Sequence, residues 1–457
     1  MYRKLNEAIY QKYIVPTERK SGKTVGVEFE FPLLNLAKQS VNLPEVQRIV
    51  RAFAEKFQFT EQKADDDGNL YSLTNPATGD NLSFDCSFNT LELSFGKEEN
   101  IHVLNQRFRL YFEDLQNQLK SVQHTLTGMG INPYHQYRIA EPIKNDRYRM
   151  LYHHLHNYPE YGDVHYHDIP EFNMIAAASQ VQLDVQKEEL IPAIHVYNLL
   201  EPFKAVLFAN SYYDELPDLL LSRDYLWRYS TQGYNPHNLG MYEIEIQNLD
   251  EYLAYVRSQS IYCVQKGDKY LHFKPIRLDE YVNLNSVTGT YFSDGKWQKF
   301  TFKPEVEDIE HHRTFKFVDL TYRGTLEFRS ACEQPVKEVF THAAFHAGLS
   351  RKLDELTELL NHDDVLYHQG YTPTELRELL TYRKYPEFID KIKLSNQLIQ
   401  ILKLAESGLA ERGFHEEKFL APLFNRAESL TNPALDFLNG LNHGDSLESY
   451  INRYAEL

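Results

Sequence analysis

The clearest pattern in the chain is a strict alternation over the seven residues 25–31, within the stretch 24–34. The apolar residues fall on one side of an extended chain, whereas Gly26, Glu28 and Glu30 fall on the other. Alternation with a period of two predicts a half-buried β-strand. The two carboxylates would lie about 7 Å apart on one face and would repel each other unless a cation lay between them. This pattern is typical of a Mg²⁺ or Mn²⁺ site, although a solvent-facing strand with two glutamates has the same pattern.

Three later segments repeat this design, with apolar residues on one face of an extended run and polar residues on the other. They span residues 82–96, where two short runs meet near Asn89, residues 179–186 and residues 325–330. Their polar residues of interest are Asp85, Glu92, Gln182, Glu327 and Arg329. Together the strands predict an antiparallel sheet whose apolar face packs on helices and whose open face is an acidic basin for hard cations. An ordinary hydrogen-bonded strand glutamine is the alternative for Gln182.

Helical periodicity dominates much of the remaining chain. Helices are expected at residues 44–57, 98–124, 187–210 and at several places beyond residue 336. Residues 240–310 instead read as β-rich, with a turn at Asp294-Gly295. The predicted fold class is therefore α+β, a curved antiparallel sheet whose acidic concave face is open and whose other face packs on helices. We expect a core over residues 1–335 and a helical C-terminal region over 336–457 packed on it, unless both form one domain.

The composition indicates an ordinary globular protein, with 42% hydrophobic and 25% charged residues among 457. The net charge of −17 argues against a nucleic-acid or anionic-membrane surface, because both are themselves negatively charged. Three cysteines are too few, and odd in number, for a disulfide framework, which fits a reducing compartment. Because the chain has no signal-peptide core and no run of about eighteen apolar residues, we expect a soluble, cytoplasmic protein.

Two stretches look like other kinds of site. Gly22-Lys23-Thr24 resembles the tail of a P-loop, but Thr17 occupies the required upstream glycine position and the segment enters a strand instead of leaving one. Residues 131–170 are rich in histidine, tyrosine and arginine, but no histidine pair has zincin spacing with an adjacent glutamate. We therefore expect neither a P-loop nor a zinc site, and we expect residues 131–170 to line or gate a pocket.

An acidic basin that holds several divalent cations suits phosphoryl transfer. Such cations would clamp a nucleoside triphosphate and neutralise a migrating phosphoryl group. An arginine in the same basin, Arg329, would stabilise the charge on that group. A glycine-rich loop is not required, because the metal ions would hold the phosphates.

The ordered set of these segments resembles the glutamate–cysteine ligase family. This is the carboxylate–amine ligase branch whose fold is similar to that of glutamine synthetase. The segments that carry the resemblance are Val27–Glu30, Asp85, Glu92, Ala178–Asp184, Phe208–Ser211, Ser222–Trp227, Leu326–Arg329 and Leu409–Pro422. No one of these motifs is decisive, but their order is specific, and together they cover residues 24–440.

The resemblance implies an ATP-dependent ligase of glutathione biosynthesis. ATP would phosphorylate the side-chain carboxylate of glutamate, and the amino group of cysteine would attack the acyl phosphate to give γ-glutamylcysteine. By matching position, Mg²⁺ or Mn²⁺ would be held by Glu28, Glu30, Asp85, Glu92, Gln182 and Glu327. Arg329 would face the transferred phosphate. Arg223 would bind the glutamate α-carboxylate, since a guanidinium matches a carboxylate bidentately; a structural ion pair is the alternative.

The sequence departs from the family pattern in two places. The family usually has an aspartate three residues after the arginine that Arg329 matches, whereas this chain has Cys332 there and Glu333 one position later. Residues 165–173 are also atypical. Both departures bear on the amine acceptor more than on the ATP chemistry. A γ-glutamyl ligase with another acceptor and a non-catalytic nucleotide-binding relative therefore stay open as alternatives, and the oligomeric state is not specified.

Overall fold

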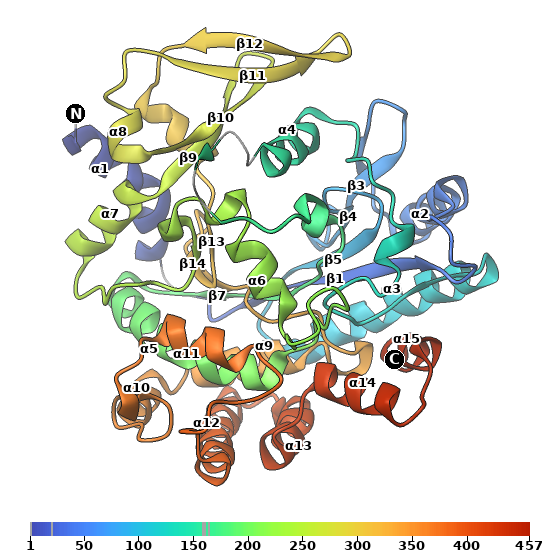
Figure 1. Cartoon of the computed structure of the whole chain (residues 1–457), viewed down its shortest axis with the longest axis vertical. Helices are drawn as coiled ribbons and strands as arrows, with labels where there is room; N and C mark the ends of the chain where they lie inside the picture. The colour runs from blue at the N-terminus through green and yellow to red at the C-terminus, as the bar shows by residue number, and fades with distance from the viewer. Residues whose placement is uncertain (1, 20–21, 158–160, 163–164) are drawn as a thin grey trace.

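The computed structural model describes residues 2–19, 22–157, 161–162 and 165–457. In this part of the chain, a nine-stranded antiparallel sheet lies at the centre of the molecule (Figure 1). Its path runs through β14 (Val318–Leu320), β15 (Thr325–Phe328), β7 (Ser179–Asp184), β1 (Val25–Asn35), β5 (Thr90–Glu98), β4 (Asn81–Phe84), β3 (Leu70–Thr74) and β2 (Glu61–Ala64). The remaining strand, β6 (His124–Leu126), pairs with the end of β1. The predicted α+β class and antiparallel sheet are confirmed.

The strand register carries one polar face across the sheet. Glu30 of β1 is paired with Glu92 of β5, and Gln182 of β7 is paired with Glu327 of β15. Glu28 lies two residues before Glu30 on β1, so its side chain points to the same face. The acids and amides that the alternation placed together therefore share one surface, as the sequence predicted.

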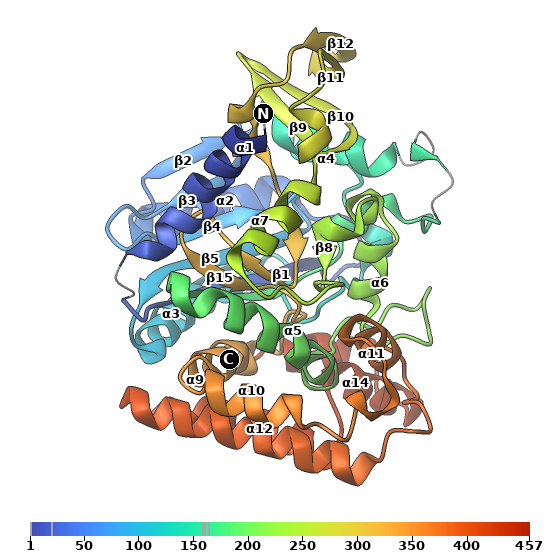
Figure 2. The same ribbon diagram turned by 90° about the vertical axis from the view of Figure 1, so that its left-hand side faces the viewer.

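Helices cover the opposite, apolar face of this sheet (Figure 2). They are α3 (Ile101–Ser121), α5 (Lys187–Phe208) and α9 (Thr341–Leu349). At the centre of β1, the ring of Phe29 lies 5.5 Å from that of Phe108 and 5.1 Å from that of Phe340, centroid to centroid. Phe340 belongs to the helical C-terminal region. One continuous hydrophobic core therefore includes residues from the first strand and from the C-terminal helices.

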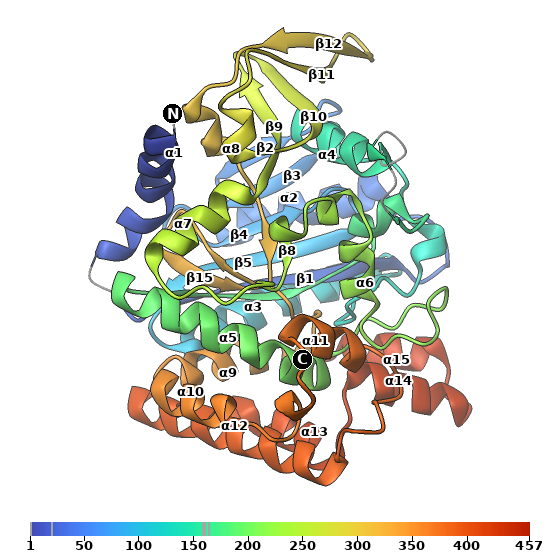
Figure 3. The ribbon, with the colours of Figure 1, turned by 60° about the vertical axis from the view of Figure 1, so that its left-hand side comes forward.

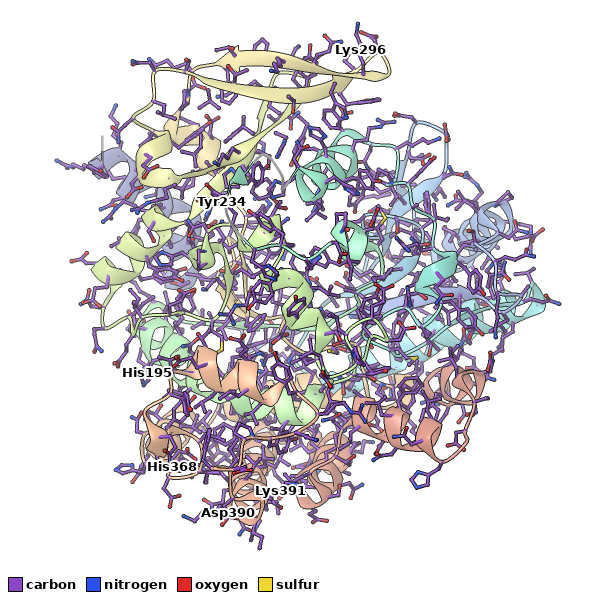
Figure 4. The ribbon with its side chains drawn as sticks, viewed as in Figure 1. His195, Tyr234, Lys296, His368, Asp390 and Lys391 are labelled. Carbon is purple, nitrogen blue, oxygen red and sulfur yellow. The ribbon has the colours of Figure 1, made fainter. Side chains whose placement is uncertain are left out.

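A smaller antiparallel sheet faces the acidic surface from the other side (Figures 1 and 3). Its strands, in spatial order, are β12 (Lys296–Phe302), β11 (Val287–Ser293), β10 (Lys269–Arg277) and β9 (Ser260–Lys266). Lys296 marks the outer turn of this sheet in Figure 4. Helix α4 (Asp146–His156) packs on β10 and β11, and a short parallel pair, β8 (Leu239–Gly240) with β13 (Phe315–Lys316), connects the two layers.

Two helices interrupt the region that the sequence predicted to be β-rich. They are α7 (Leu249–Ser258) and α8 (Leu278–Tyr281). The side chain of Asn248 accepts a hydrogen bond from the backbone N–H of Glu251, which caps the start of α7. Tyr252, Leu253, Tyr255 and Val256 form its buried face. Their spacing is helical. The rest of the region contains β9 to β12 and the expected turn at Asp294-Gly295, so its β-rich character is confirmed.

The remaining helices complete the shell. They are α1 (Tyr2–Ile9), α2 (Leu43–Phe57), α6 (Ser222–Arg228), α10 (Leu353–Asn361), α11 (Pro373–Leu380), α12 (Lys391–Arg412), α13 (Ala421–Ser429), α14 (Pro433–Asn442) and α15 (Leu447–Tyr454). The C-terminal helices form a layer beneath the central sheet in Figure 2. Within the described residues, none of these helices combines the length and apolar character needed to span a lipid bilayer.

The backbones of helices α9 and α12 come into close contact at two glycines, Gly348 and Gly408. A Cβ atom added to Gly408 of α12 would lie 2.0 Å from the carbonyl oxygen of Gly348 of α9.

We expect Gly408→Ala to lower the urea midpoint of unfolding, because overpacking costs about 1–3 kcal/mol, which exceeds the gain of at most about 1 kcal/mol in helix propensity. The exposed neighbour Ser407→Ala is the matched control. Equal midpoints for the two variants would show that the helices separate without cost.

Candidate active site

A cavity of about 1020 Å³ lies over the acidic face of the central sheet. Its floor comes from β1, β4, β5 and β7, and its walls come from α4, α6, β9, β10 and the segment that leads into β13. Glu28, Glu30, Asp85 and Glu92 all line it. With Gln182, which also lines it, five of the six predicted metal ligands border one cavity. Trp227 of α6 lines the cavity as well.

Glu327 and Gln182 form the edge of this acidic group. The amide nitrogen of Gln182 donates to Glu28 Oε1 and to Glu327 Oε1, both at 2.9 Å. Gln182 thus separates two carboxylates that would otherwise repel each other. In this arrangement Gln182 is a hydrogen-bonded strand glutamine, as the alternative interpretation had it, and its amide would have to turn over to offer oxygen to a cation. Glu327 is buried and does not itself line the cavity.

Glu30 and Glu92 are also held by donors from the chain. Glu30 Oε2 accepts from the backbone N–H of Ala178 at 2.8 Å, and Glu30 Oε1 accepts from Gln180 Nε2 at 2.9 Å. The hydroxyl of Ser94 donates to Glu92 Oε1. These contacts fix the direction of each carboxylate, but none of the three donors carries a positive charge.

Several carboxylates of the acidic face have raised pKa values. Burial, together with the neighbouring charges of Glu92 and Glu327, raises the pKa of Glu28 to about 8. Burial raises the pKa of Glu92 to about 8 and that of Glu30 to about 7, with Asp85 adding to both shifts. Carboxylates in this state favour either a proton or a metal cation. At these three acids, burial and mutual repulsion therefore outweigh the charge of the neighbouring arginines.

The donor set fits a hard cation that is shared with a substrate. Among the described residues, no three carboxylate, imidazole or thiol groups converge closely enough to hold an ion by themselves. Mg²⁺ rarely needs such a cage, because it usually keeps several waters and binds one or two carboxylates together with substrate phosphates. Glu28, Glu30, Asp85 and Glu92 border the same cavity. They can therefore offer oxygen ligands to a hydrated hard cation.

Two predicted arginines meet at this cavity. Arg329 donates through Nη2 to Glu327 Oε2 at 2.7 Å and to Gln180 Oε1 at 3.2 Å. Arg223, near the start of α6, donates from Nη1 to the carbonyl oxygen of Arg329 at 3.1 Å. No carboxylate pairs with Arg223 in the described part of the chain, so the structural ion pair that was its alternative role is absent there. Both side chains line the cavity.

The structure adds polar residues that sequence reasoning missed. Gln180 lies on the same strand face as Gln182, and the alternation was sufficient to identify it. Arg147, Arg313 and Arg323 also line the cavity. Arg147 belongs to the histidine-rich stretch that was expected to line a pocket, so that expectation is met for it; residues 158–160 and 163–164 of the stretch lie outside the described residues. Arg313 and Arg323 lie where apolar and polar residues do not alternate regularly, so no sequence pattern pointed to them.

Glu333 lies behind the acidic face. It is fully buried, and its Oε2 accepts from the backbone N–H of Glu30 at 3.1 Å and from the hydroxyl of Ser179 at 3.2 Å. It does not line the cavity, and its hydrogen bond holds the backbone of β1. Cys86 is buried beside Asp85, and burial raises the pKa of its thiol.

Comparison with known proteins places the cavity in a family context. The model of glutamate–cysteine ligase family 2 matches residues 24–392, which contain every cavity residue discussed above. The chain is 23% identical over 426 residues to the chloroplastic glutamate–cysteine ligase of Nicotiana tabacum, covering 91% of this chain and 74% of that protein. The corresponding enzyme of Brassica juncea is 23% identical over 407 residues, covering 87% and 73%. A solved glutamate–cysteine ligase from Francisella tularensis in complex with AMP aligns with a TM-score of 0.45 at 11% identity, over 96% of this chain and 88% of that one.

The raised pKa values give the protein a characteristic response to pH. In the folded, metal-free chain, Glu28, Glu30 and Glu92 hold protons that the unfolded chain has already released, because their ordinary pKa is 4.5. Raising the pH from about 5 to about 8 should therefore favour unfolding. We expect the melting temperature in EDTA to fall over this range, and Mg²⁺ to restore more stability at pH 8 than at pH 6.

Differential scanning fluorimetry in EDTA and in MgCl₂ measures this response. Glu92→Gln should flatten the pH dependence, whereas Glu61→Gln, an exposed glutamate on β2, should leave it unchanged. An effect of Mg²⁺ that is the same at every pH would contradict the assignment of the titration to these acids.

Proposed function

The chain belongs to glutamate–cysteine ligase family 2, and from this membership and the acidic cavity we propose that it joins the γ-carboxylate of glutamate to the amino group of cysteine. ATP is the second substrate, and γ-glutamylcysteine, the precursor of glutathione, is the product. The observation that carries the proposal is the cavity itself. Its uncompensated acids and its arginines lie within the residues that the family model matches.

The reaction proceeds in two transfers. The γ-carboxylate oxygen of glutamate attacks the terminal phosphorus of ATP, which forms an acyl phosphate and releases ADP. The amino group of cysteine then attacks the acyl carbon. A C–N bond forms, the C–O bond to phosphate breaks, and the amine loses a proton. The chain must hold a polyanion next to a carboxylate, which requires positive charge at both substrates.

The carboxylates of the cavity would hold Mg²⁺ or Mn²⁺, which when bound would supply part of that positive charge. We propose Glu28, Glu30, Asp85, Glu92 and Glu327 as the ligands, with Gln182 as a further ligand if its amide turns over. The hydrogen bonds from Ala178 and Gln180 hold Glu30 in place for this role.

Arg329 and Arg223 would each bind one further anionic group of the substrates. These groups are the transferred phosphoryl group and the α-carboxylate of glutamate. Glu327 and Gln180 hold the guanidinium of Arg329 beside the carboxylates, where it can meet the transferred phosphoryl group. Arg223 borders the cavity, and its guanidinium has donors beyond the Nη1 that binds the carbonyl of Arg329, which could meet the α-carboxylate of glutamate. Because its guanidinium lies next to the backbone of Arg329, the amino-acid end of glutamate would lie close to the site of phosphoryl transfer.

The compartment belongs to the same proposal. Cys86, Cys263 and Cys332 are buried and unlinked, which is typical of a reducing environment such as the cytoplasm.

An ADP-release assay with Mg²⁺, glutamate and a panel of amines tests the proposed function. We expect cysteine to give the highest rate, because the family is named for that acceptor. If another amino acid or a simple amine exceeds cysteine, the protein is a γ-glutamyl ligase with a different acceptor. If no amine raises ADP release above the control without acceptor, the protein is a non-catalytic relative.

Removing one carboxylate from the cavity should abolish turnover. Glu28→Gln retains the shape of the side chain but loses a charged oxygen ligand, so we expect ADP release to fall by at least about 100-fold. Glu61→Gln on the exposed edge strand β2 is the control and should retain wild-type activity. Wild-type activity of Glu28→Gln would exclude Glu28 as a metal ligand.

Shortening the guanidinium at position 223 should weaken glutamate binding. Arg223→Lys keeps the charge but loses the bidentate geometry, so we expect the KM for glutamate to rise by about 10- to 100-fold. The KM for ATP should change little. Arg228→Lys, at the other end of α6 in an exposed ion pair with Glu378, is the matched control. A selective rise in the KM for ATP would instead assign Arg223 to the nucleotide.

A further inference from the structure

The N-terminal residues 2–19 form a strap along one side of the molecule (Figure 3). The strap consists of α1, a π-helical turn η1 (Tyr10–Ile14) and a 3₁₀ turn η2 (Val15–Glu18). It precedes the residues that the family model matches. Helix α1 packs on α7 and on the short helix η8 (Val306–His311). Since π-helical turns are uncommon and occur often at functional positions, the side chains that this turn presents are of interest.

Lys12, in the π-helical turn, binds the carboxyl end of η8. Its Nζ donates to the carbonyl oxygens of Ile309 at 2.6 Å, His312 at 3.3 Å and Glu310 at 3.4 Å. A cation at the end of a helix satisfies carbonyl groups that have no partner within the helix. The adjacent Tyr13 places its hydroxyl 3.0 Å from Nδ1 of the buried His312. Two consecutive residues of the strap therefore fix residues 309–312.

The next residue, Arg313, lines the cavity. Its Nη1 donates to the carbonyl oxygens of Glu310 and His312, each at 2.9 Å. Lys12 binds these same two oxygens. The position of the Arg313 guanidinium is thus set by carbonyl groups that the strap also holds. The Arg313 guanidinium and the Lys12 ammonium therefore lie close together, and the carbonyl oxygens that they share offset the repulsion between the two cations.

The strap touches a second cavity segment, the turn between β14 and β15. Gly324 in this turn has φ of +76°, and a Cβ there would lie 2.5 Å from the carbonyl oxygen of Pro16. Arg19 donates to the carbonyl oxygen of Arg323. Arg323 lines the cavity and donates to Gln182 Oε1 at 3.3 Å. The strap therefore contacts the backbone beside two of the cavity arginines.

We propose that residues 2–19 are a brace that positions Arg313 and Arg323 for the anionic groups of the substrates, and that Lys12 is the positioning residue for Arg313. Phe315, two residues after Arg313, packs on Trp227 of the helix that carries Arg223, with ring centroids 4.8 Å apart. This contact joins the segment of Arg313 to the helix of Arg223, so the proposal assigns Arg313 to the same amino-acid end of the cavity. The brace acts on substrate affinity and leaves the chemical step to the acids and Arg329. The kinetic part of this inference rests on the proposed function, whereas the structural part does not.

Hydrogen exchange tests the structural part without any substrate. In Lys12→Met the carbonyl groups at the end of η8 lose their cation, so backbone amides in residues 306–317 should exchange faster than in the wild type. Lys12→Arg should restore slow exchange. Lys4→Met, an exposed lysine on the same strap, is the matched control and should change nothing. Unchanged exchange in Lys12→Met would overturn the proposal, whatever reaction the protein catalyses.

Steady-state kinetics tests the positioning role. We expect Lys12→Met to raise the KM for glutamate or for the acceptor by about 10-fold, because small displacements of a binding group are costly, while kcat changes less than 2-fold. In an Arg313→Met background the same change should add nothing further, since Lys12 acts through Arg313. The proposal would be overturned if Lys12→Met lowered kcat and left KM unchanged. It would also be overturned if Lys12→Met raised KM equally in the wild-type protein and in the Arg313→Met variant.

Tyr13→Phe provides a second variant that leaves no buried charge unpaired, in case Lys12→Met does not fold. It removes only the hydrogen bond to His312, and it should shift exchange and KM in the same direction by a smaller amount. Wild-type values for both quantities in Tyr13→Phe would contradict the brace.

Discussion

The mutual repulsion of carboxylates on one face of a buried sheet is the constraint on which the rest of this structure depends. The antiparallel register places Glu30 against Glu92 and aligns Glu28 with them on the same face. The sheet tolerates this arrangement because its other face is anchored in a large aromatic and aliphatic core. Rings from β1, α3 and the C-terminal region meet there, so the unfavourable electrostatics of one face are offset by apolar burial on the other.

The distribution of positive charge follows from this constraint. Amides and a hydroxyl bind the acids at the centre of the sheet, and arginines enter from its edges and from the loops above it. The cavity thus has an acidic floor with cationic walls. Such a surface attracts a substrate that brings metal ions on one side and carboxylates on the other, and it does so in a protein whose net charge is −17.

Alternation along the strands was sufficient to predict the acidic face, because a period of two assigns each side chain to a face independently of the rest of the fold. It placed Glu28, Glu30, Glu92 and Glu327 correctly on one sheet. It did not distinguish a ligand from a spacer, since Gln182 occupies a ligand position in the pattern and a bridging position in space. Loops carry no such period, so Arg313 and Arg323 were missed. Helix α7 was missed although its buried residues have helical spacing.

The hydrogen bonds from the Gln182 amide to Glu28 and Glu327 have a consequence for how the strands pair. With an N–H donor already directed at Glu28 and Glu327, the strands β1, β7 and β15 can pair before any ion arrives. The pairing of these three strands is therefore supported by a donor that the chain itself supplies, and the acidic face is a surface whose strand order the sequence alone specifies.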